Sequence, residues 1–137
     1  MYIISISGQS CSGKSYVTEE LAKITKPNIL HQDSYYKGGN KDTNFDEPNA
    51  IDWDLLISHI SDLKEGRSID VPIYSFEKHQ RLEKTKRMDP TKVLIIEGTM
   101  ILFNLTIRSL CNLKVYVFAS PELMYMRRLK RDVKERG

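Results

Sequence analysis

Residues 8–15 read Gly-Gln-Ser-Cys-Ser-Gly-Lys-Ser, and this stretch decides the predicted fold. It fits G-x-x-x-x-G-K-[ST], the pattern of a phosphate-binding loop, which requires a strand before the loop and a helix after it. Residues 2–7 are β-branched and apolar enough for a buried parallel strand. After the loop, Val17, Leu21 and Ile24 recur at helical spacing and predict one apolar helix face. The flanks therefore favour a nucleotide-binding loop over an ordinary glycine turn.

The residue types of the loop suit a bound polyphosphate. Gly8 and Gly13 allow a tight turn in which backbone N–H groups converge on an anion, and the helix start adds the positive end of its dipole. Lys14 is expected against the β- and γ-phosphates, and the Ser15 hydroxyl on a bridging Mg²⁺. In this stretch and directly after it, the residues predicted to contact the nucleotide are Gly8, Ser10, Ser12, Gly13, Lys14, Ser15 and Tyr16.

Length and composition limit the kind of protein. A chain of 137 residues, with 40% hydrophobic and 28% charged residues, is predicted to form a single domain over residues 1–137. The net charge of +3 is too small to indicate a nucleic-acid partner, and no apolar run approaches the roughly 20 residues of a membrane span. Cys11 and Cys111 lack metal-ligand spacing, which favours free thiols in a reducing compartment. We therefore expect a cytoplasmic protein without nucleic-acid or membrane partners.

Apolar runs separated by helical segments predict a parallel sheet with helices on both faces. The candidate strands are residues 2–7, 29–31, 93–96 and 114–118. Asp52 is placed to cap a helix that carries Leu56, Ile60 and Leu63 on one face and ends at Gly66. Residues 68–76 alternate with period two and, with a return strand near 82–86, predict a small hairpin outside the main sheet.

Two acids follow candidate strands at the edge where ligands of parallel sheets bind. Asp33 comes just after the strand at 29–31, where an aspartate can accept the proton of an attacking hydroxyl or bind Mg²⁺. The same residue could instead cap its own turn, and spacing alone does not decide between these roles. Glu97 follows the buried run 93–96 and suits a Mg²⁺ ligand, direct or through water, better than a carboxylate paired with a lysine.

The last dozen residues are rich in arginine. Pro121 and Glu122 mark the start of a helix whose apolar stripe is predicted to consist of Leu123, Met126, Leu129 and Val133. Arg127, Arg128 and Arg131 are helical neighbours whose guanidinium groups match phosphate geometry. They can form a solvated face, a lid over the phosphate loop, or both.

The chain resembles the uridine-cytidine kinases, within the family that also holds phosphoribulokinase. Six segments match in the order of that family and extend over nearly the whole chain. They are residues 8–15, 32–37, 44–48, 72–76 with His79 and Arg81, 96–98, and 128–132 with 135–137. The resemblance implies a P-loop parallel sheet with a small hairpin over the nucleoside site. It also implies ATP-dependent phosphorylation of uridine or cytidine at the 5′-hydroxyl, in pyrimidine salvage, with Mg²⁺ as cofactor.

The resemblance implies a role for each matching residue. Asp33 would be the catalytic base, and Lys14 and Arg131 would act on the transferred phosphoryl group. Arg131 and Arg136 would reach the triphosphate from the lid. The metal residues would be Ser15, Glu97 and Asp33. The substrate residues would be Asp33, Tyr36, Asp46 and Arg128 (the last two on the ribose), Tyr74 and His79 on the base edge, and Phe76 on the ring.

Three departures from the family pattern stand out. Glu47 stands where histidine is usual and Ser75 where aspartate is usual, both near the expected substrate. The family continues past Gly137 with a further helix and strand, so we expect a C-terminally truncated form of the fold. The family also often forms tetramers, which makes a homo-oligomer an expectation. The alternatives left open are a kinase of another small ribosyl substrate, such as nicotinamide riboside, and a non-catalytic nucleotide-binding module.

Overall fold

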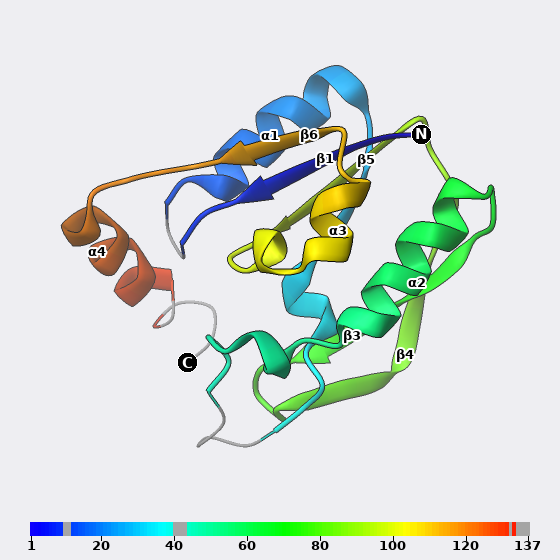
Figure 1. Cartoon of the computed structure of the whole chain (residues 1–137). Helices are drawn as coiled ribbons and strands as arrows, with labels where there is room; N and C mark the ends of the chain where they lie inside the picture. The colour runs from blue at the N-terminus through cyan, green and yellow to red at the C-terminus, as the bar shows by residue number, and fades with distance from the viewer. Residues whose placement is uncertain (10–11, 40–43, 132, 134–137) are drawn as a thin grey trace.

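The central sheet is built as the apolar runs predict. The computed structural model describes residues 1–9, 12–39, 44–131 and 133. Within them, four parallel strands lie in the order β2-β5-β1-β6 (Figure 1). Their bounds are β1 Tyr2–Ser7, β2 Asn28–His31, β5 Val93–Gly98 and β6 Leu113–Tyr116. The strand β6 begins one residue before the predicted start at 114 and ends two residues before the predicted end at 118, so it is one residue shorter than predicted.

Helices cover both faces of this sheet, which confirms the predicted fold class (Figure 1). The α-helices are α1 Lys14–Thr25, α2 Trp53–Lys64, α3 Leu105–Leu110 and α4 Pro121–Arg131. Short 3-10 helices are η1 Gln32–Tyr35, η2 Pro48–Ala50 and η3 Ile101–Phe103. None of the helices in the described residues is long and apolar enough to cross a membrane.

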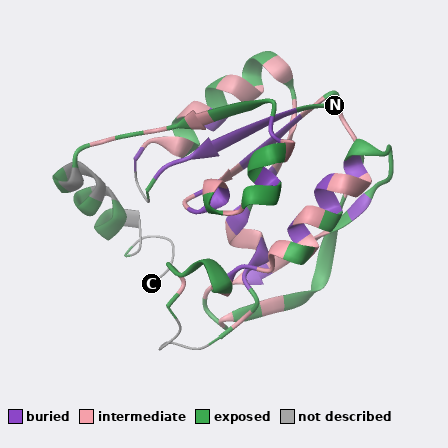
Figure 2. Ribbon diagram, in the orientation of Figure 1, coloured by how far each residue is buried: buried purple, intermediate pink, exposed green. Residues whose placement is uncertain are grey.

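The core has two unequal parts because alternate residues of β1 and β5 face opposite sides. On the α1 side, Val17 and Leu21 pack against the small cluster of Ile4, Ile6 and Ile95. On the other side lies the larger cluster, coloured as buried in Figure 2, which joins the sheet to α2, α3 and the hairpin. Its fully buried members include Ile3, Leu30, Leu56, Ile60, Leu63, Leu94, Ile96 and Ile107.

The helix α2 forms where its caps predict. The Asp52 side chain accepts a hydrogen bond from the Leu55 backbone N–H at 3.2 Å, which satisfies one of the unpaired donors of the first turn. Gly66 follows the helix with a φ of 86°, a left-handed conformation that favours glycine. The predicted face of Leu56, Ile60 and Leu63 is buried, as expected for an amphipathic helix.

The predicted hairpin is present outside the main sheet. It consists of β3 Ile69–Ser75 and β4 Gln80–Met88, paired antiparallel, so the return strand is longer than predicted. The register shifts between Pro72 and Tyr74, and beyond this irregularity Tyr74 pairs with Arg81.

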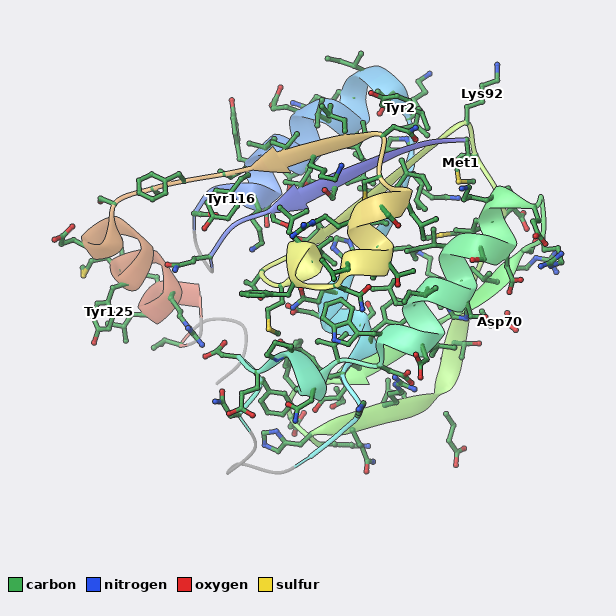
Figure 3. All side chains as sticks on the ribbon, in the orientation of Figure 1. Met1, Tyr2, Asp70, Lys92, Tyr116 and Tyr125 are labelled. Atoms are coloured by element: carbon green, nitrogen blue, oxygen red, sulfur yellow. The ribbon has the colours of Figure 1, made fainter. Side chains whose placement is uncertain are left out.

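Two predicted apolar faces differ from the structure. Ile24 is 80% exposed, because the small cluster beneath α1 extends to Val17 and Leu21 but not to the last turn. Met126 and Leu129 on α4 and Val133 just beyond it are exposed, and α4 lies beyond the carboxyl end of β6, away from the core (Figure 1). The side chain of Leu123, the remaining member of the predicted stripe, is not among those described. Tyr125 also projects outward from α4 (Figure 3). Helical spacing identifies an apolar face but does not supply a surface for it to contact.

Candidate active site

The phosphate loop leads into α1 with the geometry its glycines suggest. Gly13 is the N-cap of α1 and has a φ of 108°. At Gly8 a Cβ atom would lie 2.5 Å from the Val117 backbone oxygen, so only glycine fits against the segment after β6. Ser12 is buried, and its N–H donates to the Gln9 carbonyl at 3.1 Å. The predicted contact Ser10 lies outside the described residues.

The carboxyl ends of three neighbouring strands meet at one edge, as the parallel sheet predicts. Parallel pairing places Ser7 beside Gly98, and His31 beside Glu97. Asp33 lies in η1, directly after β2. Glu97 belongs to β5 itself, one residue before its end, because β5 extends two residues past the predicted end at 96.

A cavity of ≈ 130 Å³ lies at this edge and gathers most of the predicted phosphoryl-transfer and ribose residues. Its lining residues are Lys14, Asp33, Tyr36, Phe45, Asp46, Phe76, Glu97, Gly98, Thr99 and Arg128. Ser15 and Tyr16 are exposed on the first turn of α1 and do not line it. A second cavity of ≈ 700 Å³ lies between β2 and the hairpin and shares Asp33 and Phe76 with the first. Tyr74 lines this larger cavity, and His79 lines neither.

Glu97 pairs with a histidine that the sequence analysis did not single out. The His31 Nδ1 lies 2.7 Å from Glu97 Oε1, and the Glu97 side chain is only 14% exposed. The hydrogen bond to Glu97 is the main cause that raises the pKa of His31, with smaller contributions from the charges of Glu97 and Asp33. The sequence suggested a metal ion or a lysine as the partner of Glu97, and neither is His31. The contact between His31 and Glu97 forms only because β2 lies next to β5 in the sheet.

Gln32 joins the turn after β2 to the turn after β5. Its side chain is fully buried, donates to the Thr99 hydroxyl at 3.1 Å and accepts from the Met100 N–H at 2.7 Å. A Cβ atom on Gly98 would overlap the Gln32 side chain, so glycine is required at 98 for this contact. These bonds hold η1, and with it Asp33, against the end of β5.

Asp46 and Arg128 meet across the cavity. Arg128 Nη2 on α4 lies 3.6 Å from Asp46 Oδ2, and both side chains are largely exposed. This places the two residues predicted to bind the ribose beside each other. Arg131 ends α4, but its side chain is not among those described, and Arg136 lies outside the described residues.

An aromatic cluster joins the hairpin to the cavity. Its members are Tyr36, Phe45, Tyr74, Phe76 and His79, with ring centroids 5.0–6.1 Å apart. Phe45 stacks on His79 at 5.9 Å with an interplanar angle of 14°. Within the described part of the chain, the Tyr74 hydroxyl and the His79 Nδ1 are buried without a hydrogen-bond partner. Such atoms are costly to bury unless a ligand or water satisfies them.

The acids of the cavity fit a magnesium ion held mainly by substrate. Mg²⁺ prefers oxygen ligands and is usually bound by one or two carboxylates together with phosphate oxygens and water. Asp33 and Glu97 supply carboxylates in the same cavity as Lys14. Among the described residues no group of three or more His, Cys, Asp and Glu gathers as a metal site.

The sequence model of the phosphoribulokinase/uridine kinase family matches residues 3–137. The chain belongs to this family. Like its relatives, it is therefore a kinase, a phosphotransferase of the P-loop type. A uridine kinase from Histophilus somni is 40% identical over 149 residues, covering 98% of this chain and 70% of that protein. A uridine kinase from Salmonella paratyphi B is 38% identical over the same coverage.

Solved structures of other kinases share the fold. A candidate fructose transport system kinase from Silicibacter sp. TM1040 superposes with a TM-score of 0.82 at 16% identity, over 99% of this chain and 74% of that one. A possible uridine kinase from Bacillus stearothermophilus gives a TM-score of 0.70 at 17% identity, over 98% of this chain and 83% of that one. At these identities the likeness concerns the fold alone.

Proposed function

We propose that this family member transfers the γ-phosphoryl group of ATP to the 5′-hydroxyl of uridine or cytidine, as a pyrimidine-salvage enzyme of the cytoplasm. The observation that carries the proposal is that Lys14, Asp33 and the Asp46–Arg128 pair line one cavity. A phosphate-binding lysine, a candidate base and a ribose-binding pair are the parts that a nucleoside kinase needs side by side. The curated relatives named above support the same substrate class.

Asp33 is the proposed base. Its carboxylate would accept the proton of the 5′-hydroxyl while Lys14 holds the β- and γ-phosphates, with Arg131 and Arg136 as further proposed phosphate ligands. Gln32 and the end of β5 hold the turn that carries Asp33, so the base has little freedom to move away. Mg²⁺, with Ser15, Glu97 and Asp33 as its proposed protein ligands, would neutralise charge on the phosphates.

The hairpin is the element proposed to recognise the nucleobase of the substrate. The unpaired Tyr74 hydroxyl and His79 Nδ1 can hydrogen-bond the edge of a pyrimidine, while Phe45, Tyr36 and Phe76 supply aromatic surface for the ring. A site built to hydrogen-bond its substrate discriminates strongly against analogues that lack the matching groups. This supports a pyrimidine nucleoside over a ribosyl substrate without such an edge.

A substrate panel tests the proposal. The protein is incubated with Mg-ATP and, separately, with uridine, cytidine, adenosine, guanosine and nicotinamide riboside, and products are identified by mass spectrometry. Uridine or cytidine monophosphate is the expected product. Monophosphate from nicotinamide riboside alone would instead indicate the other ribosyl kinase. ATP binding without any product would indicate a nucleotide-binding module.

The variant Asp33→Asn tests the proposed base. Loss of a general base lowers rates by about 10²–10⁴-fold, so kcat should fall by that factor while ATP binding stays nearly unchanged. Asp70→Asn is the matched control, since Asp70 is exposed on β3 and does not line the cavity. Steady-state kinetics and ATP titration measure both effects. Turnover in Asp33→Asn equal to that in the control would remove Asp33 from the mechanism.

A further inference from the structure

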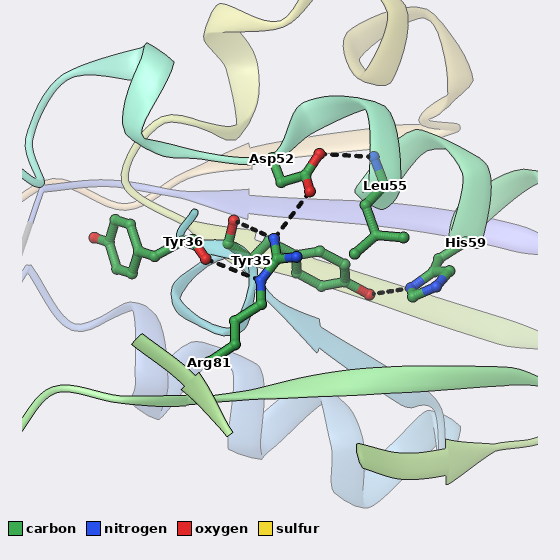
Figure 4. Close-up of polar contacts among 6 residues, drawn as sticks. All are labelled: Tyr35, Tyr36, Asp52, Leu55, His59 and Arg81. Atoms are coloured by element: carbon green, nitrogen blue, oxygen red, sulfur yellow. Dashed lines mark hydrogen bonds and ion pairs between the residues drawn. The ribbon is translucent and has the colours of Figure 1, made fainter. Parts of the chain in front are cut away.

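Arg81 connects three elements that surround the candidate active site. It lies in β4 of the hairpin, and its Nε donates to the Tyr36 carbonyl at 3.0 Å. Its Nη2 donates to the Tyr35 carbonyl at 3.4 Å and forms an ion pair with Asp52 Oδ2 at 3.0 Å (Figure 4). One guanidinium thus binds the end of η1 and the start of α2 from the hairpin.

The atoms that Arg81 holds belong to the segment after Asp33. Tyr35 is the last residue of η1 and Tyr36 its C-cap, two and three residues beyond Asp33. This segment is also tied to the start of α2, because the Asp52 N–H donates to the Tyr35 carbonyl at 2.8 Å. Asp52 meanwhile uses its other oxygen to cap α2. A shift of Arg81 would therefore be transmitted to the turn that carries the proposed base.

On the hairpin, Arg81 lies directly opposite Tyr74 in the register. Tyr74, whose hydroxyl is proposed to bind the nucleobase, is thus paired with Arg81, which binds the backbone of the turn after Asp33. The ring of Tyr36 contacts that of Tyr74, with centroids 5.3 Å apart, so side-chain packing follows the same connection.

We propose that Arg81 is a positioning residue that fixes the distance between the hairpin and Asp33, so that recognition of the base and activation of the sugar hydroxyl depend on each other. The inference rests on the proposed nucleoside kinase function. A guanidinium suits the task because its planar fork can donate to two carbonyls and a carboxylate at once, which a lysine ammonium cannot do in the same geometry. The site needs this because misplacing reacting groups by about 1 Å can cost roughly 10²-fold in rate.

Kinetics of Arg81→Met test the proposal. We expect kcat to fall by about 10- to 100-fold and the KM for uridine to rise, because both depend on the distance between the hairpin and Asp33. The KM for ATP should stay unchanged, since none of the contacts of Arg81 described above is with the phosphate loop. Arg67→Met is the control, because Arg67 also forms an ion pair, with Asp62 at 2.7 Å, but lies on the surface after α2. Unchanged kcat, or equal rises in both KM values, would overturn the proposal.

Two milder variants keep the test decisive if Arg81→Met folds poorly. Arg81→Lys should retain more activity than Arg81→Met. Asp52→Asn should also lose less activity than Arg81→Met, since the contacts of Arg81 with the two carbonyl groups remain. A double-mutant cycle adds a sharper measure: with Arg81 replaced, Tyr74→Phe should cost less in kcat than it does in the native protein. Strict additivity of the two changes would contradict the coupling.

Amide hydrogen exchange separates this inference from the proposed function. If the native protein forms no nucleoside monophosphate, the proposed function fails whatever Arg81 does. Exchange at the Asp52 N–H, which bonds to Tyr35, and at the Lys37 N–H, which bonds to Ala50 at 3.0 Å, still reports the connection. Both should exchange faster in Arg81→Lys than in Arg67→Met. Unchanged protection would show that Arg81 does not hold the turn.

Discussion

His31 and His59 show how two side chains of one type acquire opposite acid–base behaviour from their surroundings. His31 bonds to Glu97, which favours its charged form and raises its pKa. His59 is buried on α2 beside the Tyr35 hydroxyl at 2.8 Å, and burial lowers its pKa because it disfavours the charged form. Burial likewise raises the pKa of Tyr35.

The titration of His31 should therefore depend on Glu97. In metal-free buffer we expect a pKa above the ordinary value of about 6.5 for His31, and a return toward that value in Glu97→Gln. NMR of the histidine ring protons measures this, and His31→Asn assigns the resonance. Because the folded-state pKa is raised, the pair stabilises the fold below pH about 6.5, and this stabilisation is lost as pH rises through the folded-state pKa. A pKa that does not respond to Glu97→Gln would rule out the pairing in solution.

His59 should make the stability of the fold depend on pH in the opposite direction. Its folded-state pKa is depressed, so its stabilising effect is present above pH about 6.5 and is lost as the pH falls below that value. We expect His59→Gln, whose amide can still accept from Tyr35, to weaken the loss of stability between pH 7.5 and pH 5. Urea unfolding at the two pH values measures it. An identical pH dependence in the native protein and the variant would show that His59 does not titrate in this way.

At the scale of elements, the end of β5 and the turn after β2 are joined through Gln32. Its two side-chain bonds bridge residues 67 and 68 positions apart, and the close approach leaves no room for a side chain at Gly98. The overlap involves the Gln32 Cβ itself, so no rotamer of Gln32 relieves it. The two turns must therefore move together.

Gly98→Ala should push these turns apart. Overpacking at such a site costs about 1–3 kcal/mol, and kcat should fall as well, because η1 carries Asp33. Gly66→Ala makes a useful comparison: its left-handed φ of 86° costs about 1–2 kcal/mol, but it lies in open space after α2 and should leave turnover intact. Urea unfolding and steady-state kinetics on both variants separate the two effects. Full activity and full stability in Gly98→Ala would contradict the close packing.

At the scale of the whole molecule, the proposed binding sites for ATP and for the nucleoside belong to different parts of the fold. The sheet and α1 present the phosphate loop, whereas the hairpin and the segment before α2 present the aromatic cluster. The helix α4 reaches the second part through Arg128 and Asp46. ATP and nucleoside should therefore stabilise the protein through separate contacts.

Ligand-induced stabilisation can test this division. A ligand at 100 times its Kd stabilises the folded state by about 2.7 kcal/mol, which raises Tm. Tyr74→Phe should lose most of the shift caused by uridine and keep the shift caused by ATP. Tyr116→Phe, on the exposed side of the edge strand β6, should keep both. Thermal unfolding with each ligand measures the shifts, and loss of the ATP shift in Tyr74→Phe would argue against separate sites.

The sequence alone determined the features that depend on neighbouring residues. The glycine loop with its strand and helix, the Asp52 cap, the hairpin and the edge at which Asp33 and Glu97 lie all follow from local spacing and strand ends. These patterns are short-range, since each is complete within a few residues of chain. The roles of the individual site residues remain predictions.

Only the tertiary structure decided which distant residues meet. His31 reaches Glu97 because β2 pairs with β5, and Arg81 reaches Tyr36 and Asp52 because the hairpin folds back onto η1. It also left Ile24, Met126 and Leu129 exposed, against the predicted helix faces. Sequence periodicity shows which side of an element is apolar or charged, but the partner of that side depends on the order of strands and the packing of elements far apart in the chain.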